Sequence, residues 1–237
     1  MSTHSGKPGP ETRSRILDAA EALFVQHGLD GTSMRMITAA AGVNLAAVNY
    51  HFGTKDSLIH EVFKRRLGEL NQARIAALDR AEAQARGQGA GLKPSQVLEA
   101  FFTPSLEMVA DTAGGGRTFM QLLGRTYTEP NAFVRKFLAE EYAETLQRFL
   151  QALYESLPGV PREEILWRFH FMMGATSYAI AGTDALQLFA GHFDDEDPAR
   201  MLPRLISFLL GGLRAPLPDF VNAAPRPSRT ARTPDAT

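Results

Sequence analysis

Apolar side chains recur every three or four residues along most of the 237-residue chain, which is the spacing of an amphipathic α-helix. Convincing runs of alternating β-branched residues, which are typical of strands, are missing. Segments that contain glycine or proline interrupt the helical pattern at several places. The pattern therefore predicts an all-α fold built from helices of different length.

The first part of the chain is expected to form three helices ahead of a long one. Gly28 suits the end of the first helix, Gly42 and Val43 suit a turn after the second, and Asn44 suits the N-cap of the third. The expected helices span residues 11–28, 33–41, 45–52 and 55–86. The long helix is expected to connect this small head to the rest of the chain.

Larger helices are expected to form a body. They are separated by glycine-rich stretches at 87–91 and 114–116 and by the sequence from Pro158 to Pro161. Their expected spans are residues 95–112, 117–128, 130–156, 162–190 and 199–213. The chain thus divides into an N-terminal arm (1–10), a small helical head (11–56), a larger helical body (57–215) and a tail (216–237). The composition of the arm and the tail is typical of disorder.

Charge and cysteine content exclude several kinds of site. The chain carries 25 Lys and Arg against 26 Asp and Glu, so affinity for a polyanion must come from local clustering. It contains no cysteine, and its histidines lack metal-binding spacing. Without a G-x-S-x-G motif or a P-loop, we expect no enzyme activity, no metal and no cofactor. A secretory signal and a run of about 18 apolar residues are also missing, so we expect a soluble, cytoplasmic protein.

The segment from Thr32 to Lys55 reads TSMRMITAAAGVNLAAVNYHFGTK, which is a helix, a glycine-centred turn and a second helix. This arrangement is typical of a helix-turn-helix that binds DNA. Small and amide side chains let the helix after the turn enter the major groove, where the candidates for base contacts are Asn44, Ala46, Ala47 and Asn49. Donors for phosphate oxygens are Thr32, Ser33, Arg35, Tyr50, His51 and Lys55. In the alternative interpretation, Tyr50 and His51 only complete a small three-helix bundle.

Residues 12–60, and especially AAGVNLAAVNYHFGTKDSLI, resemble the DNA-binding head of TetR-type transcriptional repressors. The resemblance implies a three-helix head whose third helix lies in the major groove, and a homodimer that binds a palindromic operator. It implies the same base contacts, and phosphate contacts at Thr32, Ser33, Tyr50, His51 and Lys55. Many members have Tyr where this chain has Asn49, which leaves open whether Asn49 or Tyr50 faces phosphate.

Three fragments, VNLAAVNYHFGTKDSLI, FMQLLGRTY and LWRFHFMMGATSYAIAGTDAL, are similar to PsrA-type regulators. Those repressors respond to long-chain fatty acids or acyl-CoA and control fatty-acid degradation genes. The resemblance implies a fatty-acid-sensing repressor of lipid-metabolism genes. Two alternatives remain open: the effector is another apolar small molecule, or the protein has no ligand and a partner protein regulates it.

The body is rich in methionine and aromatic residues, which line adaptable apolar cavities. The candidate ligand-binding residues are Phe101, Phe102, Met108, Met120, Leu123, Arg125, Tyr127, Phe137, Trp167, Phe171 and Tyr178. The alternative for each apolar residue is ordinary core packing. Arg125 or Arg168 is expected to meet a ligand head group, or else to pair with a glutamate. For acyl-CoA, the candidates for the phosphates are Arg117, Arg125, Arg135 and Lys136.

The last two helices are expected to form the dimer contact. Small residues such as Gly174 and Ala175 on one helix and leucines such as Leu205 and Leu209 on the other allow close approach, so two copies would form a four-helix bundle. A dimer is required because two recognition helices must reach successive major grooves. We expect the helix at 56–86 to transmit effector binding to the head.

Overall fold

The computed structural model describes residues 9–111, 114–127, 132–180 and 198–222, and every regular element within these ranges is an α-helix. The all-α prediction is therefore confirmed. The helices are α1 (Pro10–Gly31), α2 (Met34–Ala41), α3 (Leu45–Phe52), α4 (Lys55–Gly87), α5 (Pro94–Ala110), α6 (Gly116–Thr126), α7 (Ala132–Ser156), α8 (Arg162–Ile180), α10 (Pro198–Leu213) and α11 (Asp219–Asn222).

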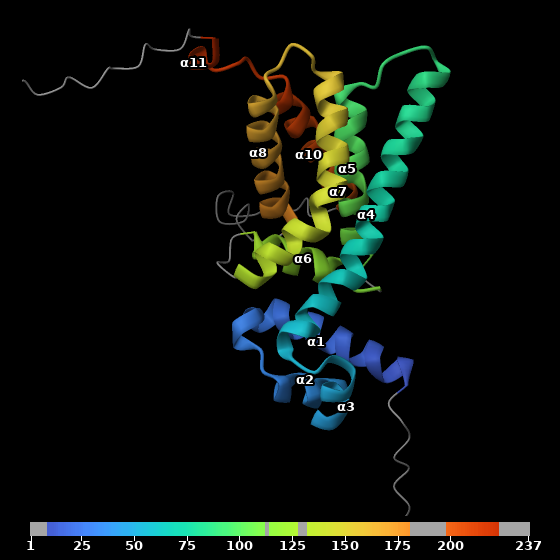
Figure 1. The fold of residues 1–237 in the computed structure, drawn as a ribbon, viewed down its shortest axis with the longest axis vertical. Helices are drawn as coiled ribbons and strands as arrows, with labels where there is room; N and C mark the ends of the chain where they lie inside the picture. The colour runs from blue at the N-terminus through green and yellow to red at the C-terminus, as the bar shows by residue number, and fades with distance from the viewer. Residues whose placement is uncertain (1–8, 112–113, 128–131, 181–197, 223–237) are drawn as a thin grey trace, which may run out of the picture.

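Helices α1 to α3 form a head at one end of the molecule (Figure 1). Helix α4 leaves the head and runs up along one side of the body, where α5, α7, α8 and α10 stand roughly alongside one another. Helix α6 lies across the lower end of this bundle and packs against α1, α5 and α8. The head therefore contacts the body through two helices, α4 and α6.

Side-chain caps fix the short helices of the head. Ser33 Oγ accepts a hydrogen bond from the Met36 amide (3.2 Å), and Asn44 Oδ1 accepts one from the Ala47 amide (2.8 Å). Between them, Gly42 adopts a left-handed conformation with φ 61°, and a β-carbon there would meet the Arg15 guanidinium at 2.9 Å. The helix-turn-helix geometry thus follows from local sequence signals.

A few boundaries differ from the sequence-based expectation. Gly28 interrupts the first helix with φ 73°, as expected of its end, but the chain makes a further turn to Gly31. The tail was expected from residue 216, yet residues 216–222 are described and include α11. The expected continuation of α8 to residue 190, the residues from 223 onward and most of the N-terminal arm lie outside the described residues.

A buried cluster of charges joins α1 to α4. Arg65 donates to Asp18 (2.7 Å) and to Glu21 (2.8 Å), and Arg66 lies 3.6 Å from the same Glu21 carboxylate. Burial raises the pKa of Glu21, and the two arginines partly offset that rise. On the other side of α1, Arg125 of α6 donates a hydrogen bond to the Val25 carbonyl. These contacts hold the head against both α4 and α6.

Among the described helices, none is long and apolar enough to cross a membrane.

Candidate nucleic-acid interface and effector cavity

Helix α3 presents one face to solvent, formed by Leu45, Ala46, Asn49 and Tyr50. Leu45 is 45% exposed and Tyr50 is 70% exposed. Val48 and Phe52 point into the head core on the opposite side. The exposed face carries small, amide and phenolic groups, which are suited to the base edges and phosphates of a major groove.

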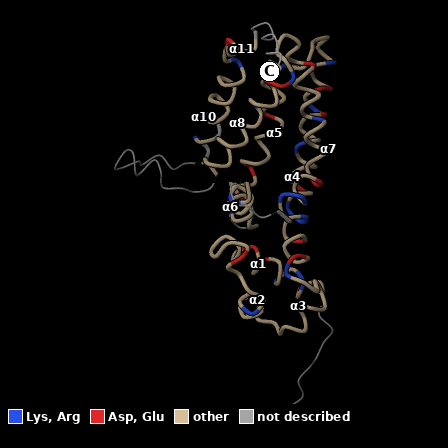
Figure 2. The backbone as a smooth tube through the Cα atoms, turned by 60° about the vertical axis from the view of Figure 1, so that its left-hand side comes forward, with Lys and Arg blue, Asp and Glu red and all other residues tan. Residues whose placement is uncertain are grey.

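The segment that carries this face contains no acidic residue. The 25 residues from Gly31 to Lys55 include no Asp or Glu, and Ser33 and Arg35 are exposed on the neighbouring α2. Figure 2 shows the basic position on α2 at the head end of the molecule. Local positive charge at the exposed side of α2 and α3 allows DNA binding even though the net charge of the whole chain is −1.

Two of the expected DNA contacts are wrong for the head as folded. Thr32 is 1% exposed, and its Oγ1 donates to the carbonyl oxygens of Gly28 (2.8 Å) and Leu23 (3.1 Å), so it stabilises the end of α1. Ala47 is only 9% exposed because the buried face of α3 is wide enough to include it. Leu45 takes its place on the exposed face, and its position four residues before Asn49 was the signal for it.

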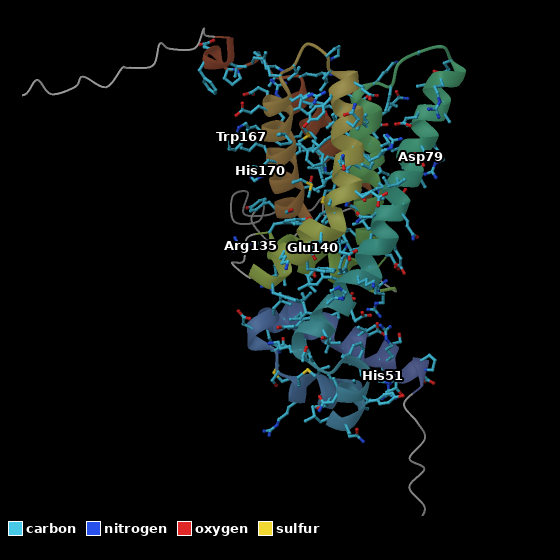
Figure 3. All side chains as sticks on the ribbon, viewed as in Figure 1. His51, Asp79, Arg135, Glu140, Trp167 and His170 are labelled. Carbon is cyan, nitrogen blue, oxygen red and sulfur yellow. The ribbon has the colours of Figure 1, made fainter. Side chains whose placement is uncertain are left out.

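His51, labelled in Figure 3, is less exposed than the residues of this face. It is half-buried, its ring contacts Tyr50 and Phe52, and its Nε2 has no hydrogen-bond partner. It lines an open hollow together with residues from α1, α4 and α7, including Arg13 and His60. The structure therefore places His51 at a hollow that is open to solvent, and a phosphate contact by this residue stays a prediction.

Asn44 and Lys55 keep part of their capacity for DNA. The Asn44 side chain caps α3 through its carbonyl oxygen, which leaves its amide group exposed and able to donate. Lys55 donates to the Asp30 carbonyl (3.3 Å) at the start of α4, close to the end of α3. Both residues flank the exposed face, Asn44 at its N-terminal end and Lys55 beyond its C-terminal end.

The body contains a small, partly open cavity of about 20 Å³, which is room for about one water molecule. Four of the expected ligand-binding residues line it: Phe102, Met120, Leu123 and Tyr127. The other lining residues are Arg74, Ser105, Gly124, Met173, Thr176, Ser177 and Ile180. Helices α4, α5, α6 and α8 therefore meet at this cavity.

The remaining candidates lie elsewhere. Phe101 packs edge-on against Phe149 and Phe169, and Phe137 packs against His60 and Phe63, so both are core residues. Met108 is partly buried beside the core and does not line the cavity.

Three aromatic candidates are directed outward and not toward the cavity. Trp167, Phe171 and Tyr178 are 51%, 64% and 58% exposed on α8. Figure 3 shows Trp167 and His170 on the side of α8 that faces away from α7. Helical spacing identified them as an apolar stripe, but a stripe that meets a core and one that meets another molecule have the same spacing.

Neither arginine that was expected to meet a head group lines the cavity. Arg125 is exposed and donates to the Val25 carbonyl of the head. Arg168 donates to the carbonyl oxygens of Leu213 (2.5 Å) and Ala215 (2.7 Å), so it caps the C-terminal end of α10. The four candidates for the CoA phosphates do not line the cavity either, and all of them are exposed: Arg117, Arg125, Arg135 and Lys136.

The cation at the cavity is Arg74, which the sequence analysis missed. Arg74 is 2% exposed, and the spacing of Leu67, Leu70, Arg74 and Leu78 places it on the buried stripe of α4. That spacing was the signal that could have found it. Its guanidinium donates to Phe101 O (3.1 Å), Ser105 Oγ (2.8 Å) and Asn71 Oδ1 (3.3 Å), and it lies 4.0 Å from the centroid of the Phe101 ring.

Two hydroxyl groups accompany Arg74 at the cavity. The Tyr127 hydroxyl donates to the Tyr142 hydroxyl (3.2 Å), and burial raises the pKa of Tyr127 well above 10, so it stays protonated. Thr176 is 6% exposed, and its Oγ1 has no hydrogen-bond partner. The cavity thus combines apolar walls with a small polar end. No group of acidic and histidine side chains suited to a metal occurs among the residues that the structure describes.

Two family models match this chain. Residues 16–62 match the bacterial regulatory proteins of the tetR family, and residues 99–212 match the C-terminal domain of tetracyclin repressor-like proteins. The HTH-type transcriptional regulator AcrR of Shigella flexneri is 36% identical over 107 residues, which are 45% of this chain and 46% of that protein. The chain thus spans less than half the length of this curated relative.

Solved structures share the fold. The fatty acid degradation regulator FadR from Bacillus halodurans aligns with a TM-score of 0.59 at 18% identity, over 89% of this chain and all of that one. FadR from Bacillus subtilis in complex with stearoyl-CoA aligns with a TM-score of 0.58 at 14% identity, over 84% and 98% of the two chains. The two family matches cover most of the head and most of the body, and this chain therefore belongs to the TetR family of bacterial regulatory proteins.

Proposed function

We propose that the protein is a transcriptional repressor that binds a palindromic operator as a homodimer and releases it when an apolar effector enters the body. The observation that carries this proposal is the exposed face of α3. It is bordered by α2, which carries the exposed Arg35 and contains no Asp or Glu. A helix with this surface fits a major groove, and membership of the family supports that role. The protein acts by binding and not as an enzyme.

The second subunit of the dimer supplies the second DNA-binding head. Trp167, Phe171 and Tyr178 on α8 and Phe208 on the adjacent α10 are each more than half exposed. An apolar surface of this kind on two packed helices is suited to a second copy of the same surface, which would give a four-helix bundle. The two heads would then address half-sites related by a two-fold axis.

Effector binding is transmitted to the head by α4 and α6. Met120 and Leu123 of α6 line the cavity, whereas Arg125 of the same helix holds the Val25 carbonyl of α1. Arg74 of α4 lines the cavity, whereas Arg65 of α4 holds Asp18 and Glu21 of α1. An effector needs more room than about 20 Å³, so its entry moves these helices and with them the heads. A coupling of about 1–3 kcal/mol lowers operator affinity about 5- to 150-fold.

A long-chain fatty acid or acyl-CoA is the favoured effector, and lipid-metabolism genes are the favoured targets. The Met and Phe lining of the cavity supports this, as do the FadR neighbours, one described as a fatty acid degradation regulator and one solved with stearoyl-CoA. Another apolar effector remains the second candidate, because the neighbours share only the fold at these identities.

Selection of DNA from a random pool by the purified protein tests the DNA-binding part. We expect an inverted repeat to be enriched, and the variant Asn49→Ala to change the preferred base within each half-site. A pool without any enriched sequence would contradict the proposal.

A further inference from the structure

We infer that the effector is an apolar acid whose free carboxylate binds Arg74 at the polar end of the body cavity, with the Thr176 hydroxyl as a second donor. The inference rests on the proposed function and specifies the chemical class of its effector. It starts from a buried cation that has only neutral partners.

Arg74 is buried without a compensating negative charge. The three acceptors of its hydrogen bonds are a main-chain carbonyl, a serine hydroxyl and an asparagine amide oxygen, all of them neutral. Within the described part of the chain, no Asp or Glu forms an ion pair with it, although Arg65 and Arg148 each have such partners. Buried charges in proteins are normally paired, so an uncompensated guanidinium beside a cavity favours an anionic ligand.

Donors remain for that anion. A guanidinium carries five N–H groups, and three of those of Arg74 are used. Thr176 lines the same cavity. The residue is only 6% exposed, and yet its Oγ1 has no hydrogen-bond partner. An unpartnered buried hydroxyl is uncommon, and a carboxylate oxygen would accept its proton. A guanidinium and a hydroxyl that converge on one small space fit a carboxylate of two oxygens.

The site selects against a thioester. A single enclosed cation matches one compact negative charge, whereas the phosphates of CoA need several cations at a surface. The apolar residues that line the cavity are Phe102, Met120, Leu123, Met173 and Ile180, which suit a hydrocarbon tail. Helices α6 and α8 pack closely beside the cavity, since a β-carbon at Gly124 of α6 would be 3.2 Å from the Ser177 carbonyl oxygen of α8, so a tail that lies between them must move them apart.

The inference explains how a head group acts on the DNA-binding head. Arg74 lies nine residues after Arg65 on α4, which is about 14 Å along the helix. A carboxylate that pulls on Arg74 therefore acts on the same rigid helix that holds Asp18 and Glu21 of α1.

Calorimetric titration of the full chain tests the assignment with decanoate and oleate, the matched alcohols decanol and oleyl alcohol, and oleoyl-CoA. We expect the acids to bind at least about tenfold more tightly than the alcohols and the thioester. Arg74→Met should remove this preference. The matched control is Arg80→Met, because Arg80 is exposed on the same helix and should leave it unchanged.

Thr176→Val keeps the test decisive if Arg74→Met does not fold. Because Thr176 Oγ1 has no partner, the valine variant should unfold at the wild-type temperature or above, and yet bind the acids severalfold more weakly with unchanged alcohol binding. Arg74→Lys, which keeps the charge, should retain part of the preference for acids.

Equal binding of acids and alcohols by the wild type, or wild-type acid binding by both Arg74→Met and Thr176→Val, would overturn the inference. So would the failure of both acids to bind. If alcohols or the thioester released selected DNA instead, the proposed repressor function would stand and only the carboxylate site would fail. A protein that selects no DNA would contradict the proposed function itself.

Discussion

The indole of Trp167 stacks on the ring of Phe171 at the surface of α8, with centroids 5.7 Å apart and planes inclined by 29°. Both side chains are more than half exposed. Stacked aromatic side chains that remain exposed are typical of an interface, since they offer a large rigid surface at low entropic cost.

Phe171→Asp is therefore expected to dissociate the dimer. A charge at the centre of an apolar contact should cost about 2 kcal/mol or more in each subunit. Sedimentation equilibrium should give the mass of two chains for the wild type and of one chain for the variant. Phe220→Asp is the control, because Phe220 is 75% exposed on α11 and belongs to neither α8 nor α10, so this variant should remain dimeric. A dimeric Phe171→Asp variant would mean that another surface holds the copies together.

Arg35 and Lys55 are expected to bind phosphates without reading sequence. Their replacement by Ala should weaken binding to all sequences evenly and reduce the slope of log K against log salt by about one unit for each residue in each subunit of the dimer. Titrations of the selected operator at several salt concentrations measure this slope. Arg80→Ala, on the body, should leave it unchanged, and an unchanged slope in the head variants would exclude these contacts.

Asn49 and Tyr50 are expected to have different roles on the exposed face of α3. Asn49→Ala should cost about 1–3 kcal/mol at one base pair of each half-site and little at the others. Tyr50→Phe should weaken binding evenly, since it removes a phosphate donor. Competition between operators with single base changes separates the two effects. Loss of base preference in Tyr50→Phe, with none in Asn49→Ala, would reverse the assignment.

The stability of the body is expected to depend on Glu82. Arg148 of α7 donates to both carboxylate oxygens of Glu82 on α4, at 2.7 and 2.6 Å, and these bonds lower the pKa of Glu82 below its ordinary value of 4.5. A lowered pKa in the folded state stabilises the protein fully above about 4.5, and this stabilisation is lost as the pH falls through the lowered pKa.

Glu82→Gln should lower the free energy of unfolding by about 0.5–1 kcal/mol at neutral pH, a modest value because the Arg148 side chain is 38% exposed. The difference from the wild type should vanish at low pH in urea titrations. Glu69→Gln, at an exposed position on the same helix, should have no effect. A difference that persists at low pH would assign the effect of Glu82 to packing instead of charge.

The sequence predicts the head well because its signals are local. Ser33, Gly42 and Asn44 determine where helices begin and end through bonds within four residues, so the pattern alone locates them. The burial of Thr32 and Ala47 depends on how α1 and α3 pack together, and no local signal shows it. Side-chain chemistry alone therefore included two candidates that are buried in the folded head.

The cavity could be predicted only in part for a related reason. Phe102, Met120 and Leu123 were identified by their apolar character, which is sufficient for residues that line a core. Arg74 was missed because arginine usually faces solvent, although its place between Leu70 and Leu78 indicated burial. Trp167 and Phe171 were assigned to the ligand site. The spacing of apolar residues is the same on a helix face that packs into the core and on one that packs against another subunit.

The central claim is that an effector in the body controls the affinity of the head for DNA. Fluorescence anisotropy of a labelled, selected operator, titrated with the 237-residue chain in the absence and presence of saturating oleate, tests it most directly. We predict that oleate lowers operator affinity about 5- to 150-fold, and that it does so much less in Arg125→Ala, which lacks the bond from α6 to the Val25 carbonyl. An operator affinity that is unchanged or increased by oleate would contradict the account.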